Sequence, residues 1–231
     1  MHASSARPPF SSPSSFIRRA AALLVCALAL ASAASAQDEG RYSLRLLAGA
    51  TPLGVDTLDA RFDGAATTTS GEVDYEAGLA SGLAFGIRLS EHWEVDLEYL
   101  YRTSELSELT FPDGMRFTEG DFSSVTVSAS LNYVFRAGQR WRPYVGAGLG
   151  WVQEVDIDFE DASGETSFET DDFGYQLQAG IRYEASDRWA ASFEFRTFDA
   201  GEIELEAEDG PGTVTSDYTP LNVLVGVRYR F

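Results

Sequence analysis

Histidine and cysteine, which most often serve as catalytic bases, nucleophiles and metal ligands, are scarce in this chain. Its 231 residues include two histidines and one cysteine. His2 and Cys26 lie near the amino terminus, so His92 is the one such residue after residue 36. A single histidine in a predicted turn provides neither a Ser-His or Asp-His mechanism nor a set of zinc ligands. We therefore expect no enzymatic activity, no catalytic residues and no cofactor.

Carboxylates are abundant, and the best candidates for holding a hard cation are Asp156, Asp158 and Glu160. Acids at alternate positions are typical of calcium loops. Asp161 stands where that motif requires glycine, and no glutamate stands at its final ligand position. We therefore expect a solvated or salt-adapted acidic surface here, and treat these three residues as weak calcium candidates.

Arginines and carboxylates recur at alternate positions of several segments, so that they fall on one face of each predicted strand. If these strands close into a narrow barrel, this face lines its lumen, where each unpaired charge would cost several kcal/mol. Arginine can pair with a carboxylate there through its planar guanidinium group. We therefore predict a lumenal network of ion pairs that closes the interior. Its members are Arg45, Arg88, Glu94, Asp96, Glu98, Arg102, Arg182, Glu184, Glu194, Arg196, Arg228 and Arg230, and Arg41 shares the same parity. We expect Arg88, Arg182, Arg196 and Arg228 to pair with Glu94, Glu98, Glu184 and Glu194.

Eight segments of roughly ten residues or more, with bulky apolar groups on the opposite face, must position these charges. We expect strands at about 41–50, 78–89, 93–102, 122–135, 141–152, 172–184, 189–199 and 219–231. Three tripeptides, each ending in tryptophan and spaced 48 residues apart, mark short turns between them: Glu91-His92-Trp93, Gln139-Arg140-Trp141 and Asp187-Arg188-Trp189. The four other connections, about 51–77, 103–121, 153–171 and 200–218, are long and polar. Short turns at one end and long loops at the other are typical of a transmembrane barrel.

Aromatic residues predict where such a barrel meets the two membrane interfaces. Trp93, Trp141, Trp189, Tyr133, Tyr183 and Tyr229 fall near one rim, and Tyr99, Tyr101, Trp151 and Tyr175 near the other. A soluble eight-stranded barrel with its bulky face inward is the alternative.

Small residues on the inward face, including Gly146, Gly148 and Gly150, have two interpretations. They leave a shallow vestibule, or they allow close packing in curved strands.

The amino terminus predicts export. Arg18 and Arg19 precede an apolar run from Ala20 to Ala31 that is too short to span a bilayer. Ala34-Ser35-Ala36 then provides a signal-peptidase pattern, with cleavage between Ala36 and Gln37. Val25 stands where a lipoprotein signal has a small residue before Cys26, which disfavours a lipid anchor. We expect a signal peptide at 1–36 and one barrel domain at 37–231.

The last segment, LNVLVGVRYRF, alternates strictly and ends on an aromatic residue. It resembles the terminal strand of bacterial outer-membrane barrels, whose final phenylalanine is read by the barrel-insertion machinery. The resemblance implies that Tyr229 and Phe231 form the assembly signal. FGIRLSEHWEVDLEYLYR (85–102) and RPYVGAGLGW (142–151) likewise resemble a hairpin and a glycine-rich strand of the OmpA-like, OmpX-like and OmpW-like small barrels, the outer membrane protein beta-barrel domain.

That resemblance implies an all-β, eight-stranded antiparallel transmembrane barrel in the cell outer membrane, with short periplasmic turns and long acidic outer loops. Its partners would be outer-membrane lipid and lipopolysaccharide, and the family contains structural anchors, adhesion factors and narrow channels. We expect a structural or cell-surface role with a closed lumen. The alternative is a narrow channel for small or hydrophobic solutes.

Charge excludes one class of partner. After residue 36 the chain has fourteen arginines and thirty-six acids, a net charge of −22. Twenty-seven of those acids lie at 51–77, 103–121, 153–172 and 199–218, opposed there by Arg61 and Arg116 alone. Such a field repels the phosphates of nucleic acid and attracts divalent cations to the outer loops.

Overall fold

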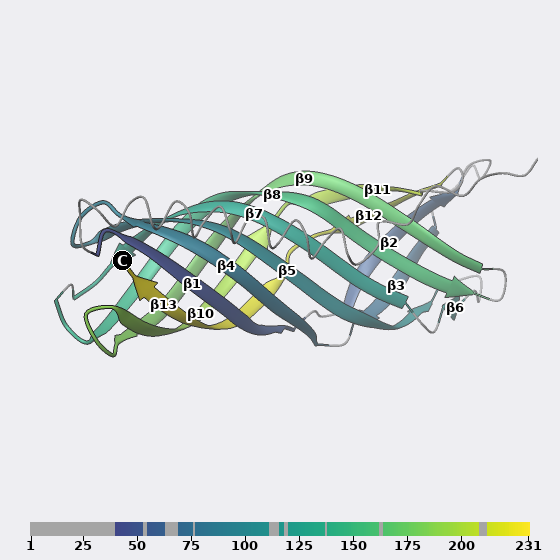
Figure 1. Ribbon diagram of the computed structural model, residues 1–231. Helices are drawn as coiled ribbons and strands as arrows, with labels where there is room; N and C mark the ends of the chain where they lie inside the picture. Colours follow the sequence, from purple (N-terminus) through teal and green to yellow (C-terminus); the bar gives the residue numbers. More distant parts are fainter. Residues whose placement is uncertain are drawn as a thin grey trace, which may run out of the picture.

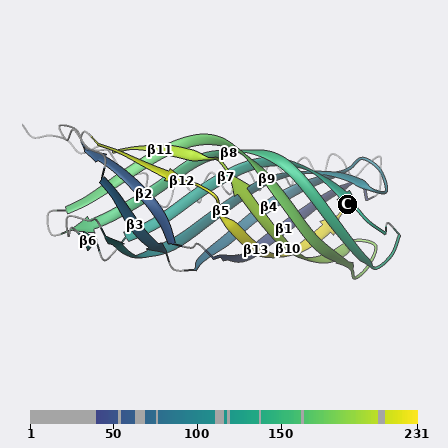
Figure 2. The same cartoon turned by 180° about the vertical axis from the view of Figure 1, so that it is seen from behind.

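The fold is an elongated barrel of antiparallel strands, seen from two sides in Figures 1 and 2. The computed structural model describes residues 40–52, 55–62, 69–75, 77–110, 116–117, 120–136, 138–161, 164–207 and 212–231. The predicted signal peptide, with Ala36 and Gln37, lies outside these ranges. None of the described segments is a helix long and apolar enough to cross a membrane.

Eight strands form the barrel and confirm the eight that the sequence predicts. They are β1 (Tyr42–Thr51), β4 (Gly78–Arg88), β5 (Trp93–Thr110), β7 (Gly120–Val134), β8 (Trp141–Asp161), β9 (Gly164–Glu184), β10 (Trp189–Asp199) and β13 (Leu221–Arg230). Each pairs with the next, and β13 returns to pair with β1, where Val227 lies opposite Leu46. The ring is therefore closed, with no unpaired edge.

Much of the long connections, expected as polar loops, is also β-structure. They contain β2 (Val55–Phe62), β3 (Thr69–Tyr75), β6 (Arg116–Phe117), β11 (Glu202–Ala207) and β12 (Gly212–Asp217). Strand β3 pairs with β5, β2 with β12, and β11 with β9. The order β5-β3-β2-β12-β11-β9-β8-β7 thus closes a second ring that continues the wall past the first. The sequence does not predict these strands readily, because acids occupy many of their positions and weaken the alternation of apolar and polar residues. In β11 the segment EIELEA nevertheless alternates strictly.

The two ends of the barrel differ, and we call them the turn end and the hairpin end. The turn end contains the short turns at 89–92, 135–140 and 185–188, and the hairpin end contains the second ring. In the first turn the Ser90 hydroxyl accepts hydrogen bonds from the backbone N–H groups of His92 and Trp93, at 3.3 and 3.1 Å. Ser186 does the same for Arg188 and Trp189 in the third turn.

The tryptophan repeat forms one rim of aromatic pairs at the turn end. Each tryptophan packs against a tyrosine of the neighbouring strand, with ring centroids 4.7–5.0 Å apart; the pairs are Trp93–Tyr133, Trp141–Tyr183 and Trp189–Tyr229. Rings with an apolar body and a polar tip collect at membrane interfaces.

The outer face of the barrel is apolar. Leu79, Leu149 and Phe173 are 68%, 72% and 73% exposed, and leucine, valine, isoleucine and phenylalanine occupy many other exposed positions. Arginines and carboxylates occupy the interior instead. The soluble-barrel alternative is therefore wrong, because that fold buries its bulky apolar face.

Candidate functional site

The interior of the barrel contains one connected network of four arginines and four carboxylates. Glu94, Asp96 and Glu98 come from β5, Glu194 and Arg196 from β10, and Arg45, Arg182 and Arg228 from β1, β9 and β13. The β-strand period of two places all of them on the inward face. None is more than 5% exposed.

The contacts run without interruption through the network. Arg182 holds Glu94 through two parallel hydrogen bonds of 3.0 and 2.8 Å. Arg228 bridges Glu94 at 2.7 Å and Asp96 at 3.1 Å. Arg45 continues from Asp96 at 3.0 Å to Glu194 at 3.1 Å. These are charge-assisted bonds, the strongest hydrogen bonds that side chains form.

The final link crosses the barrel. Arg196 of β10 donates to the Glu98 carboxylate of β5 at 2.9 Å and also pairs with Glu194. Strands β5 and β10 are separated by three strands in each direction around the ring, so this contact spans the lumen. Four positive and four negative groups leave no net charge, as a buried cluster requires.

Neutral groups satisfy further atoms of the network. The Tyr144 hydroxyl donates to Glu194 Oε2 at 2.6 Å, and the Asn132 amide donates to Asp96 at 3.2 Å. Gln178 bonds Asn132 in turn. These bonds orient the carboxylates of Glu194 and Asp96, whereas the buried Nε atoms of Arg45, Arg196 and Arg228 have no hydrogen-bond partner among the described residues.

An apolar layer lies in the lumen on the hairpin side of the network. Leu47, Leu100 and Leu224 form it, together with Ala80. Farther along, the Phe198 ring is fully buried against β8 and β9, where a Cβ on Gly150 or Gly174 would lie 2.7 Å from it. The glycines therefore admit an interior ring, which supports the close-packing interpretation over the vestibule.

Most of the chain matches a known protein family whose fold agrees with this geometry. Residues 20–231 match the model of the family described as outer membrane protein beta-barrel domain. This chain belongs to that family. No curated protein sequence matches the chain.

Solved structures of outer-membrane barrels share its fold. OprG from Pseudomonas aeruginosa is 16% identical with a TM-score of 0.62, and the match covers 84% of this chain and 98% of that one. Neisserial surface protein A is 14% identical with a TM-score of 0.52, covering 84% of this chain and 100% of that one. The chain is thus a barrel of the bacterial outer membrane.

Not every predicted member of this barrel's charge network forms an ion pair. Arg102 is buried, but its described partners are neutral: Asn222 at 2.9 Å and Thr126 at 2.7 Å. Arg88 lies at the turn end and, among the described side chains, pairs with no carboxylate. The expected pairing of Arg88 is therefore not found. Glu184 pairs with Arg230 at 2.5 Å, not with Arg88. Arg142 also approaches the Glu184 carboxylate, at 3.5 Å.

Two interior side chains, Tyr144 and Phe198, were not predicted from the sequence. Both share the inward parity of their strands, Tyr144 with Gly146 on β8 and Phe198 with Arg196 on β10. The period of two was the signal that would have found them.

The remaining predicted residues fall into two groups. Asp156, Asp158 and Glu160 lie on β8, in a part whose side chains the structure does not describe, and no cluster of metal-binding groups occurs among the described residues. Tyr229 and Phe231 stack edge to face at 5.1 Å, and the backbone N–H of Phe231 donates to the Tyr42 carbonyl at 3.0 Å. The chain end is thus held against β1 where the ring closes.

Proposed function

We propose that the protein is a structural or cell-surface barrel of the outer membrane, whose lumen is closed by ion pairs. The observation that carries this proposal is the contact of Arg196 with Glu98 across the lumen. An eight-stranded barrel leaves an interior just wide enough for side chains to fill. Charge balance and the apolar layer beyond the network support the same conclusion.

We assign the turn end to the periplasm and the hairpin end to the exterior. Short periplasmic turns and long extracellular connections are the usual asymmetry of such barrels. The predicted signal peptide at 1–36 supports export. The excess of acids in the hairpin segments would then attract the divalent cations that bridge lipopolysaccharide phosphates.

A narrow channel for small or hydrophobic solutes is the second candidate. The observation that favours it is the apolar layer of Leu47, Leu100 and Leu224, because an apolar solute would be compatible with those side chains. That route would still have to pass the network of Arg45 and Arg196, which lies between this layer and the turn end.

A paired experiment separates the two functions. Deleting the gene from its host should raise sensitivity to detergents and chelators, and the wild-type gene should restore resistance. Liposomes that contain the refolded protein should admit neither small sugars nor short alkanes faster than empty liposomes. Uptake into the liposomes, with unchanged sensitivity of the deletion strain, would favour the channel.

Deleting Phe231 should reduce assembly into the outer membrane. The deletion removes the aromatic that packs on Tyr229 and the N–H that bonds the Tyr42 carbonyl at the closure of the ring. Cell fractionation measures the assembled fraction, with Phe135→Ala, at another exposed phenylalanine, as the control. Normal assembly of the deleted protein would rule out this signal.

Neutralising the acids between residues 153 and 172 should weaken calcium-dependent association with lipopolysaccharide. This segment contains nine acids and no base. Calorimetric titration of calcium into wild type and a variant with Asn and Gln at those positions measures the effect. Equal heats in the two proteins would show that the acids serve solvation only.

A further inference from the structure

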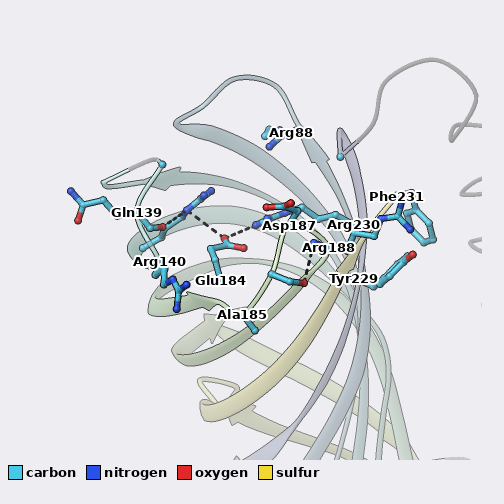
Figure 3. A pocket seen from close by; sticks show the side chains of 14 residues that line it. Arg88, Gln139, Arg140, Glu184, Ala185, Asp187, Arg188, Tyr229, Arg230 and Phe231 are labelled. Atoms are coloured by element: carbon cyan, nitrogen blue, oxygen red, sulfur yellow. Dashed lines mark hydrogen bonds and ion pairs between the residues drawn. The ribbon is translucent and has the colours of Figure 1, made fainter.

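The turn end contains a cavity that the lumenal network does not use. It encloses about 650 Å³ and opens at the end of the barrel (Figure 3). Five arginines line it, from the end of β4, the second turn, the start of β8, the third turn and the end of β13; they are Arg88, Arg140, Arg142, Arg188 and Arg230. Two acidic side chains, Glu184 and Asp187, line it as well, together with Phe231 and its main-chain carboxylate.

The carboxylates do not neutralise these arginines. Glu184 is engaged by Arg230 at 2.5 Å and Arg142 at 3.5 Å, as the dashed lines in Figure 3 show for this carboxylate. Within the described part of the chain, Arg88, Arg140 and Arg188 form no ion pair. Three guanidinium groups from three separate segments therefore line one cavity without a carboxylate partner among the described residues.

The cavity is a blind recess. Glu184 and Arg230 are each 8% exposed in its wall. Two residues farther along β9, Arg182 is 1% exposed and held by Glu94 through two bonds. A ligand that enters from the turn end therefore meets the ion-pair network, so this cavity is suited to holding a group instead of passing it.

The charge of the recess contrasts with that of the whole molecule. After residue 36 the net charge is −22, yet the described lining of the recess has five arginines against two acidic side chains and the main-chain carboxylate of Phe231. A strongly acidic protein gains nothing in solubility from clustered arginines, and like charges at one mouth repel each other. An anion placed among them removes that repulsion and accepts hydrogen bonds from each planar fork.

We propose that the recess binds a phosphate group. Phosphate presents several acceptor oxygens to guanidinium forks from different sides, which suits donors on three separate segments. Tyr229 and Phe231, which line one side, belong to the aromatic rim, so a phospholipid headgroup can approach beside them. A soluble phosphate can enter from the open end. Both sources offer the same chemistry.

Titration calorimetry with inorganic pyrophosphate tests the site, using the full-length barrel refolded in zwitterionic detergent. Arg88→Gln and Arg140→Gln should each weaken binding about tenfold, since a charge-assisted bond contributes roughly one factor of ten or more. Arg136→Gln is the matched control, because it removes the same charge from an exposed position in the second turn that does not line the cavity. The control should bind as wild type does. No binding to wild type, or an equal loss in the control, would overturn the proposal.

Native mass spectrometry then distinguishes the two sources. Protein extracted from phosphatidylglycerol vesicles should retain a lipid in wild type and Arg136→Gln but lose it in Arg88→Gln if the headgroup is the ligand. No retained lipid, with pyrophosphate still bound, assigns the site to a soluble phosphate. Neither readout depends on whether the lumen conducts, so the closed-lumen proposal can fail without this one.

Discussion

Replacing Glu98 with alanine lowers the free energy of unfolding of the barrel by about 3–5 kcal/mol, the usual cost of removing one partner from a buried ion pair. The reason is that Arg196, 1% exposed, loses the carboxylate that it contacts across the lumen, and Arg45 loses a neighbour at 3.4 Å. The remaining network has one excess positive charge, shared by Arg45 and Arg196, which are each 1% exposed. Urea unfolding in lipid vesicles, followed by tryptophan fluorescence, measures the change.

Two controls make this result specific. Glu91→Ala removes an exposed acid from the first turn and should shift stability by less than about 0.5 kcal/mol. The double variant Glu98→Leu with Arg196→Met removes both charges, so it should recover much of the loss because no guanidinium is left unpaired. A double variant that is less stable than the single one by the full cost of a second substitution would show that the two side chains are not coupled.

The substitution Gly150→Val should lower the free energy of unfolding of the barrel by about 1–3 kcal/mol, the usual cost of overpacking an interior. A Cβ at this glycine would lie 2.7 Å from the Phe198 ring and 3.1 Å from the Ser128 Cβ. Ala147→Val on the same strand is the control, because Ala147 faces outward and is exposed. Phe198→Leu should relieve part of the cost in the Gly150→Val background. Equal effects of the two valines would show that Phe198 does not fill the space beside Gly150.

The strands and the inward face were predictable because one physical rule sets both. A transmembrane strand alternates between lipid and lumen, so the parity of Glu94, Asp96 and Glu98 places them together inside. The tryptophan repeat fixed where the turns fall, and Trp93, Trp141 and Trp189 each begin a strand. These features are local in the chain, and a single sequence records them.

The pairing of charges was less predictable, because it depends on the stagger of strands around the ring. The alternation of inward and outward residues predicts which side chains face the lumen, but not which of them pair. It does not predict that Arg230 pairs with Glu184 while Arg88 stays at the turn end. Nor does it predict that Arg102 bonds Asn222 and Thr126. The second ring was missed for another reason. Its strands are short and acidic, so their alternation is weak beside their polarity, and they acquire partners only when the first ring brings β5 and β9 into place.

Planar-bilayer recording of the refolded wild-type protein tests the closed lumen most directly. The contact between Arg196 and Glu98, with the apolar layer beyond it, predicts that the wild type shows negligible conductance at every applied voltage. Glu98→Ala, which removes this link, should admit water and brief ion passage. Steady, discrete openings from the wild type would contradict the closed lumen and establish the channel in its place.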